Sequence, residues 1–182
     1  MKRSAIIFIF LISLIAGFIW YGYSLPQLSH ITLSQSFNRP TNYIWKLIFE
    51  FQNYPKWREN IYAVEKTTDV GKHIAWKEIN GHGVVTPFQL INFKRYRLIT
   101  LQETGENHLN SGKWHFQLTA SDDKKSTTLT ITEDRLIPNP LTRAINYLFD
   151  NRTKNIDSYF RSINNKLHRD EIKTEKEGIQ QN

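Results

Sequence analysis

The chain has 182 residues, a formal net charge of +7 at pH 7 and no cysteine. The absence of cysteine excludes disulfide bonds, thiolate catalysis and zinc sites built on sulfur. The length fits one ordinary domain plus a short extension, enough to bury a core without covalent cross-links. Three explanations are open for the positive charge: a nucleic-acid partner, an anionic lipid surface, or solubility alone.

An apolar run, residues 5–23, begins just after Lys2 and Arg3 and contains no charged residue. As a helix rising 1.5 Å per residue it would extend about 28 Å, roughly the hydrocarbon thickness of a bilayer. Aromatic residues gather at its C-terminal end, where a membrane helix meets the headgroups. We therefore expect residues 1–25 to anchor the chain in a bilayer, with lipid contacts from Phe8, Phe10, Trp20, Tyr21 and Tyr23.

The basic residues before the run predict its orientation. No further lysine or arginine follows until Arg39, so the positive-inside rule places the N-terminus in the cytoplasm. The domain would then lie on the non-cytoplasmic side, which in a bacterium is the periplasmic face of the inner membrane. The alternative is a cleaved signal peptide, whose only candidate cleavage site, 22–24, lies in an aromatic stretch. The uncleaved anchor is favoured, and it favours lipid over nucleic acid as the partner.

Beyond Pro26 the chain predicts a strand, two helical segments and then a series of strands. Residues 30–37 alternate between apolar and polar, as a half-buried strand does. A helix is expected over 41–52 and a short helical turn at 54–58. Short polar connections, including 69–72 and 105–112, separate the later segments, which predicts an antiparallel meander. Its expected strands are 61–68, 74–79, 84–93, 96–103, 114–120 and 127–135.

One long C-terminal helix is expected after Pro138 and Pro140. Apolar residues recur at steps of three, four and seven from Leu141 to Leu167, with Arg152 as an interruption. Residues 169–182 lose this pattern and are expected to form a disordered polar tail. The predicted fold class is α+β: one domain over residues 29–168, in which a curved antiparallel sheet wraps around the long helix, preceded by an N-terminal transmembrane helix.

Two segments resemble the START-like superfamily of helix-grip domains, also called SRPBCC or polyketide cyclase/dehydrase-like proteins. The first, FEFQNYPKWRENI, has Phe51, Tyr54, Pro55 and Trp57 at the family's positions. The second, KWHFQLTASDDKKSTTLTITEDRLIPNPLTR, is similar to the family's last hairpin and the start of its C-terminal helix. The residues that carry this second match are Trp114, Phe116, Thr128, Glu133, Asn139, Pro140, Leu141 and Arg143.

The resemblance covers about residues 31–167 and implies a cavity between sheet and helix that binds lipids or other hydrophobic molecules. The superfamily has no shared catalytic motif, and a membrane anchor is not a general feature of it. We expect no cofactor, no metal and no catalytic residue; the sequence does not indicate a protein partner. The residues expected to form the cavity are Trp57, Trp114, Phe116, Leu129, Ile131, Glu133, Leu148, Arg152 and Ile156.

Several of these residues have two interpretations. Trp57 could form a lip of the cavity with Tyr54 and Pro55, or it could fill the gap between helix and sheet. Arg152 could meet an acidic ligand or a carboxylate such as Glu133, or it could extend to solvent. Glu133 could pair with Arg143 beside the helix start, which is favoured over a catalytic role.

Other polar residues give weaker signals. The six histidines show no metal-ligand spacing, and only His82, in a predicted turn, is a candidate for proton transfer. The string 93–97 mixes aromatic and basic residues, as nucleic-acid binders do. At a hairpin end it is more typical of a solvated turn, although it could touch lipid phosphates.

Three functions are therefore compared. The first is a membrane-anchored START-like domain that binds a hydrophobic small molecule or lipid. The second is a cyclase- or hydratase-type enzyme in the same cavity, which requires polar groups that converge inside it. The third is a domain whose core is filled by side chains and whose surface docks to a membrane complex.

Overall fold

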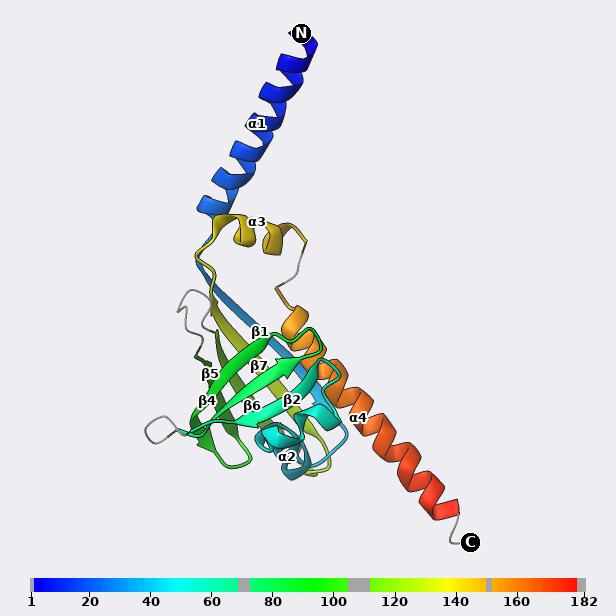
Figure 1. Ribbon diagram of the computed structural model, residues 1–182. Coiled ribbons are helices and arrows are strands. Elements are labelled where there is room, and N and C mark those ends of the chain that lie inside the picture. The colour runs from blue at the N-terminus through cyan, green and yellow to red at the C-terminus, as the bar shows by residue number, and fades with distance from the viewer. Residues whose placement is uncertain (1, 69–72, 105–111, 150–151, 180–182) are drawn as a thin grey trace.

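The computed structural model describes residues 2–68, 73–104, 112–149 and 152–179. An N-terminal helix stands at one end of the molecule, a curved sheet forms the middle, and a long helix runs across the sheet (Figure 1). The chain order is α1 (Lys2–Ser24), β1 (Leu28–Phe37), α2 (Thr41–Phe49), the 3-10 helix η1 (Phe51–Lys56), then β2 to β7, α3 (Pro140–Leu148) and α4 (Lys154–Ile179).

The sheet has seven antiparallel strands in the order β1-β7-β6-β5-β4-β3-β2. The later strands are β2 (Ile61–Lys66), β3 (Ala75–Asn80), β4 (Val85–Lys94), β5 (Leu98–Glu103), β6 (Gly112–Ala120) and β7 (Thr127–Leu136). Each strand after β2 pairs with its predecessor, which confirms the predicted meander, and β1 closes the order beside β7. The turn expected at 69–72 and most of the loop at 105–112 lie outside the described residues.

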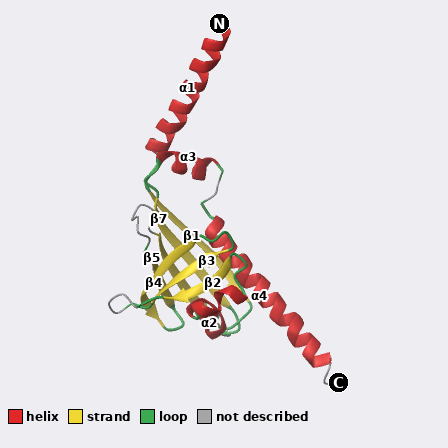
Figure 2. Ribbon diagram, in the orientation of Figure 1, coloured by secondary structure: helices red, strands yellow, loops and turns green. Residues whose placement is uncertain are grey.

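Successive side chains along each strand point to opposite faces of the sheet, one facing solvent and the other buried. On the β1–β7 pair the outward row consists of hydroxyls, with Thr32 bonded to Thr132 at 2.9 Å and Ser34 bonded to Thr130 at 2.8 Å. The inward row includes Leu129 and Ile131, both fully buried. The helices and the strands are distinguished in Figure 2, where α4 crosses one face of the sheet. The structure thus shows the predicted helix-grip α+β fold.

The prediction of one continuous C-terminal helix is wrong. The helix divides into α3, which ends at Leu148, and α4, which begins at Lys154; Phe149, Arg152 and Thr153 between them are not helical. The segment from 150 to 155, DNRTKN, is rich in asparagine, aspartate and threonine, which have poor helix propensity. The apolar stripe contains no member between Phe149 and Ile156, so packing does not compensate for this weakness.

The tail also differs from the prediction, because α4 continues to Ile179 instead of becoming disordered after residue 168. Glu171 accepts a hydrogen bond from Arg39 at 3.1 Å, and Asp170 bonds both to Tyr43 and to Lys166. Ion pairs four residues apart, such as Lys166 with Asp170, stabilise the C-terminal part of α4, where the apolar stripe has ended. The sequence prediction considered apolar periodicity alone and missed these charge pairs.

The helix α1 remains almost fully exposed. Its residues 6–24 form a segment long and apolar enough to cross a membrane. The five residues predicted to contact lipid are all exposed in the structure, from 37 % for Tyr21 to 75 % for Trp20. This helix contributes nothing to the core of the domain, which is complete without it.

Candidate functional site

A cavity of about 320 Å³ lies between the sheet and the first turns of α4. Antiparallel pairing brings the starts of β2, β4 and β6 and the ends of β3, β5 and β7 to one end of the sheet. All the strand residues of the cavity lie near this end, from which the chain also leads to α3 and α1. The lining residues are Arg58, Asn60, Ile61, Glu78, Asn80, Val84, Thr86, Phe88, Glu103, Trp114, Arg135, Asn155 and Ser158.

The first charged pair of the cavity joins Arg58 and Glu78. The guanidinium of Arg58 donates to the Glu78 carboxylate at 2.8 Å, and both side chains are largely buried. The indole N–H of Trp76 donates to the other carboxylate oxygen at 3.2 Å. The guanidinium also lies 4.8 Å from the ring centres of both Tyr54 and Tyr159, a cation–π arrangement on two sides. Arg58 is therefore held in one position at the cavity wall.

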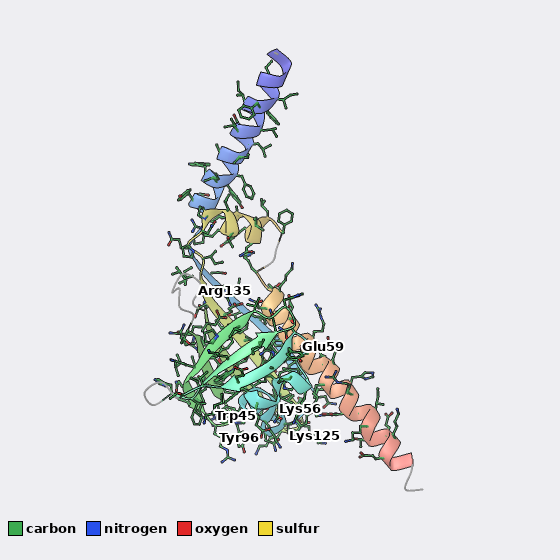
Figure 3. All side chains as sticks on the ribbon, viewed as in Figure 1. Trp45, Lys56, Glu59, Tyr96, Lys125 and Arg135 are labelled. Carbon is green, nitrogen blue, oxygen red and sulfur yellow. The ribbon has the colours of Figure 1, made fainter. Side chains whose placement is uncertain are left out.

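The second charged group is centred on Arg135. Its guanidinium donates to Glu103 and to Glu133, each at 2.7 Å. Trp114 adds an indole N–H bond to Glu103 at 3.2 Å, and Asn155 donates to Glu133 at 3.1 Å. Because Asn155 belongs to α4 and the other residues to the sheet, this network joins the two layers at the cavity. Figure 3 labels Arg135 at the end of the sheet nearest α3.

Deeper between sheet and helix, aromatic side chains occupy the space. Only about 20 Å³ remains among residues that include Tyr54, Leu101, Phe116 and Tyr159. Tyr159 packs against Trp57 and Phe116 with ring centres 5.4 and 5.1 Å apart. The inner part of the groove is thus a packed core, and the open space is the polar cavity beside it.

Burial changes the acidity of several of these groups. Removal from water raises the pKa of Glu133 above its usual range, although Arg135 and Asn155 act in the opposite direction. Burial likewise raises the pKa of Tyr54 and of Tyr159, so both phenols stay neutral at physiological pH. The cavity therefore presents two guanidinium groups, three carboxyl groups close to them, and neutral phenols behind the first pair.

The raised pKa of Glu133 leads to a prediction about pH dependence. An acid whose pKa is higher in the folded state contributes stability that is full below its usual pKa of 4.5. That contribution is lost as the pH rises through the higher folded-state pKa. We expect Glu133→Gln to remove this loss, so its unfolding free energy relative to wild type increases from pH 4 to neutrality. Urea unfolding at a series of pH values measures this difference.

The control for this prediction is Glu65→Gln, which changes an exposed glutamate on β2. It should leave the pH dependence of stability unchanged. A decrease in the relative stability of Glu133→Gln with rising pH would show that the ion pair with Arg135 outweighs the cost of burial.

The structure places the residues expected to form the cavity in three different environments. Trp114 lines the cavity, while Phe116 and the buried Trp57 pack in the aromatic core beside it. Glu133 reaches the cavity network through Arg135. Leu129, Ile131 and Ile156 are fully buried in the core.

For three further residues the structure shows a position or an interaction partner that differs from the expectation. Leu148 is not a cavity wall, because α3 packs on α1 and leaves this side chain 56 % exposed. Glu133 does not pair with Arg143, whose guanidinium instead donates to the backbone carbonyls of Gly22, Ile137 and Pro138. Arg152 lies with its guanidinium 4.4 Å from the ring centre of Tyr147.

Sequence reasoning missed Arg58, Glu78, Glu103 and Arg135. A usable signal was present, since each inward row changes from apolar to charged near the same end of the sheet. In β3 the row is Trp76, Glu78; in β5 it is Leu101, Glu103; in β7 it is Leu129, Ile131, Glu133, Arg135. Together with the strand register of the meander, this pattern would have predicted that the charged residues lie close to one another at one end of the sheet.

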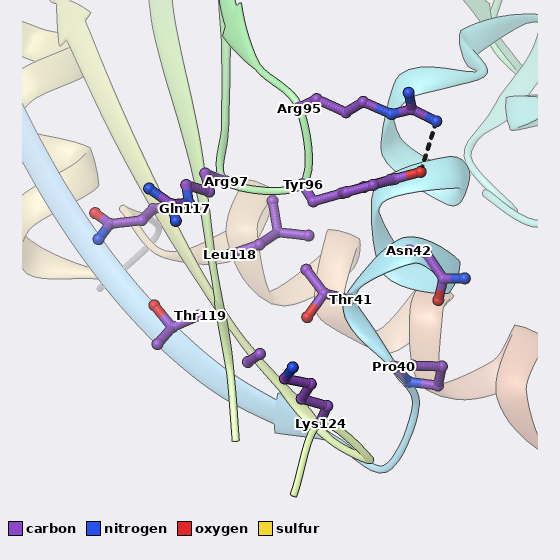
Figure 4. Close-up of a pocket in the computed structure, with 11 residues that line it drawn as sticks. Pro40, Thr41, Asn42, Arg95, Tyr96, Arg97, Gln117, Leu118, Thr119 and Lys124 are labelled. Atoms are coloured by element: carbon purple, nitrogen blue, oxygen red, sulfur yellow. Dashed lines mark hydrogen bonds between the residues drawn. The ribbon is translucent and has the colours of Figure 1, made fainter. Parts of the chain in front are cut away.

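A second, larger surface pocket of about 820 Å³ lies at the opposite end of the sheet. It is lined by Arg95 and Tyr96, where the Arg95 guanidinium donates to the Tyr96 hydroxyl at 2.7 Å (Figure 4). Tyr96 has a φ of +61°, a left-handed turn conformation that is uncommon for this residue type. The basic string 93–97 thus lies at the end of the domain away from α1.

No histidine among the described residues lines the cavity. His82 is exposed in the β3–β4 turn, and His30 pairs with Asp134 at 2.6 Å on the outer face of the sheet. Among the described residues, no group of three His, Asp or Glu side chains is arranged to hold a metal ion. The smaller cavity, with its buried ion pairs, is therefore the candidate functional site.

No protein-family model matches the chain, and no curated protein matches it. Solved structures with the same architecture do match. A START superfamily protein from Mycobacterium smegmatis aligns with a TM-score of 0.60 at 12 % identity, over 77 % of this chain and 97 % of that one. The Zhui aromatase/cyclase from Streptomyces sp. R1128 aligns with a TM-score of 0.59 at 11 % identity, over 78 % and 94 %.

The fold is that of the START-like superfamily. At these identities the match concerns the fold alone, and it confirms the expectation drawn from the sequence resemblance. A di-domain aromatase/cyclase, StfQ, from the steffimycin biosynthetic pathway also aligns, with a TM-score of 0.60 at 10 % identity over 75 % of this chain and 49 % of that one. In this chain the space under α4 is split into a packed aromatic core and a polar cavity.

Proposed function

We propose that the protein is a membrane-anchored START-like domain that binds an amphiphilic ligand, a lipid or another hydrophobic small molecule with a polar head. The observation that carries the proposal is the pair of partly buried arginines, Arg58 and Arg135, at the wall of a cavity of about 320 Å³. A guanidinium presents several N–H donors in a fixed plane and suits phosphate and carboxylate groups. The head of the ligand would occupy this polar space.

The apolar part of the ligand would have a different place from that expected from the sequence. With about 20 Å³ free in the aromatic core, a long chain does not fit there beside the present side chains. It would contact Ile61, Val84, Phe88 and Trp114 at the cavity and extend through the mouth. Since the cavity is at the end of the domain nearest α1, that direction leads toward the bilayer.

The anchor is part of the proposal. The helix α1 would span the membrane with the N-terminus in the cytoplasm and the domain on the other side, as Lys2 and Arg3 indicate. A tether of this kind raises the local concentration of membrane-derived ligands at the cavity. Nucleic acid is not a proposed partner, because the basic string lies on a hairpin end far from the site.

The proposal predicts that a tryptophan in the cavity blocks ligand binding. Ser158→Trp places an indole in the cavity from α4, and Arg161→Trp adds the same side chain at an exposed position one turn away. We expect a fatty acid carrying a diazirine to cross-link to cavity residues of the full-length protein in nanodiscs. The yield at these residues should fall several-fold in Ser158→Trp and stay unchanged in Arg161→Trp. Peptide mass spectrometry locates the cross-links.

Cross-links confined to α1, in wild type and both variants alike, would contradict ligand binding in the cavity and favour the third function, a docking domain with a filled core.

The cyclase- or hydratase-type enzyme stays a second candidate because charged pairs do converge in the cavity, as that function requires. Compounds extracted from wild type and from Ser158→Trp distinguish the two functions. If the protein only binds its ligand, both yield the same compound, in smaller amount from Ser158→Trp. If it is a cyclase- or hydratase-type enzyme, the compounds from the two proteins differ by the elements of water.

A further inference from the structure

The short helix α3 has an apolar face that does not contact the domain. Leu141, Ile145 and Leu148 lie one helical turn apart along one side, and they are 41, 43 and 56 % exposed. Phe149, at the C-terminal end, is 70 % exposed. Arg143, on the opposite side, is buried, and so is Ala144 at the border of the apolar face. An amphipathic helix of a globular protein normally turns its apolar face to the core, so this reversed arrangement requires another apolar contact.

The place of α3 is fixed by close contacts with the end of α1. Gly22 of α1 lies against the backbone of Pro140, so closely that a Cβ at Gly22 would be 2.1 Å from the Pro140 carbonyl oxygen. Arg143 donates from Nε to the Gly22 carbonyl at 2.9 Å. Asn139 caps the helix by accepting hydrogen bonds from the backbone N–H groups of Leu141 and Thr142. Figure 1 shows α3 lying across the end of α1, between α1 and the sheet.

The same contacts remove charge from the exposed face. The only ionisable side chain of α3 that carries charge at neutral pH is Arg143, and it is turned inward to carbonyls of Gly22, Ile137 and Pro138. Apart from Thr142, the exposed residues of α3 are apolar, and they continue the apolar surface of α1, whose Trp20 and Tyr23 are also exposed. A protein surface of this composition at the end of a membrane span fits the boundary between headgroups and acyl chains.

We infer that α3 is an interfacial helix that lies on the bilayer with Leu141, Ile145, Leu148 and Phe149 inserted among the lipids. The inference rests on the proposed function in one respect, that α1 spans the membrane. It adds a second attachment, which prevents the domain from turning freely about the anchor. Since the cavity lies near the end of the sheet nearest α3, this attachment holds the cavity close to the headgroups.

The chain has no native cysteine, so single cysteines can be placed without a background. The full-length protein is reconstituted in nanodiscs of phosphatidylcholine and phosphatidylglycerol, which leave both membrane faces open to solvent. An environment-sensitive fluorophore is attached in turn to Ile145→Cys and Leu148→Cys on α3. Ile12→Cys in α1 tests the span, and Arg161→Cys, exposed on α4, reports a surface in water. Quenching is measured with aqueous iodide and with lipids spin-labelled at shallow or deep positions.

We expect the two α3 labels to be quenched most by the shallow spin label, and by iodide several-fold less than the Arg161→Cys label. The Ile12→Cys label should respond to the deep spin label. Iodide quenching of the α3 labels equal to that at Arg161→Cys, with Ile12→Cys still quenched by lipid, would overturn the inference and leave the anchor in place. Protection of the α3 labels from both quenchers would overturn it in favour of a protein contact, such as a second copy of the chain. An Ile12→Cys label without lipid quenching would overturn the span and the inference together.

Discussion

Replacing Arg58 by methionine is expected to lower the free energy of unfolding by about 3–5 kcal/mol. The change leaves Glu78 as a buried carboxylate whose nearest cation, 2.8 Å away in the wild type, is gone. The energetic cost of such a change comes mainly from the charge that stays behind without a partner. Loss of the guanidinium between the rings of Tyr54 and Tyr159 adds to it. Urea unfolding of the full-length protein in a non-ionic detergent, followed by tryptophan fluorescence, measures the change.

Two further variants separate the buried charge from other effects. Lys56→Met removes an exposed cation from the neighbouring turn and should change stability by less than about 0.5 kcal/mol. The double variant Arg58→Met, Glu78→Gln removes the charge from both partners and should recover a large part of the loss. A single variant that costs less than about 1 kcal/mol, or a double variant no more stable than the single one, would show that the pair is not buried in solution.

A methyl group at Gly22 is expected to detach α3 from α1. The Cβ of Gly22→Ala would lie 2.1 Å from a backbone oxygen of Pro140, and no flexible side chain is present there to move aside. The two helices must separate, which also breaks the hydrogen bond from Arg143 to the Gly22 carbonyl. Spin labels on Tyr23→Cys and Leu148→Cys, both at exposed positions, should then give a broad distance distribution in place of a narrow one.

Gly17→Ala provides the matched control on the same helix, because a Cβ at Gly17 meets no atom within 4 Å. It should leave the distance distribution as narrow as in the wild type, and alanine favours the helix over glycine by about 1 kcal/mol. Equal distributions for Gly22→Ala and the wild type would mean that α3 and α1 do not pack as described.

The strands and the apolar helix could be predicted from the sequence because their signals are local. Alternation in 30–37 and 127–135 gave two strands within two residues of their observed bounds, and the charge-free run 5–23 gave α1. The division between α3 and α4 was missed because spacing alone linked Phe149 to Ile156 across a segment of weak helix formers. The helical tail was missed because its support comes from charge pairs and from Arg39 and Tyr43, more than 120 residues away.

The candidate site was harder to predict because its chemistry depends on long-range register. Glu103, Glu133 and Arg135 meet only when β5, β6 and β7 are aligned, and Arg58 meets Glu78 only when η1 is folded against β3. The sequence resemblance correctly indicated the fold and a space beneath the C-terminal helix. It could not show that large aromatic residues, Tyr54 and Tyr159 among them, fill the inner part of that space.

The pairing of β1 with β7 has a mechanical consequence for a domain held by α1. Their register runs from Leu28 opposite Leu136 to Phe37 opposite Thr127, and β1 follows the anchor directly. With α1 in a bilayer, as proposed, a force that pulls the domain away from the membrane would act along β1. The hydrogen bonds to β7 lie across this direction, so they share the load and must fail together rather than one after another. The tether would resist pulling through the same strand pair that closes the sheet.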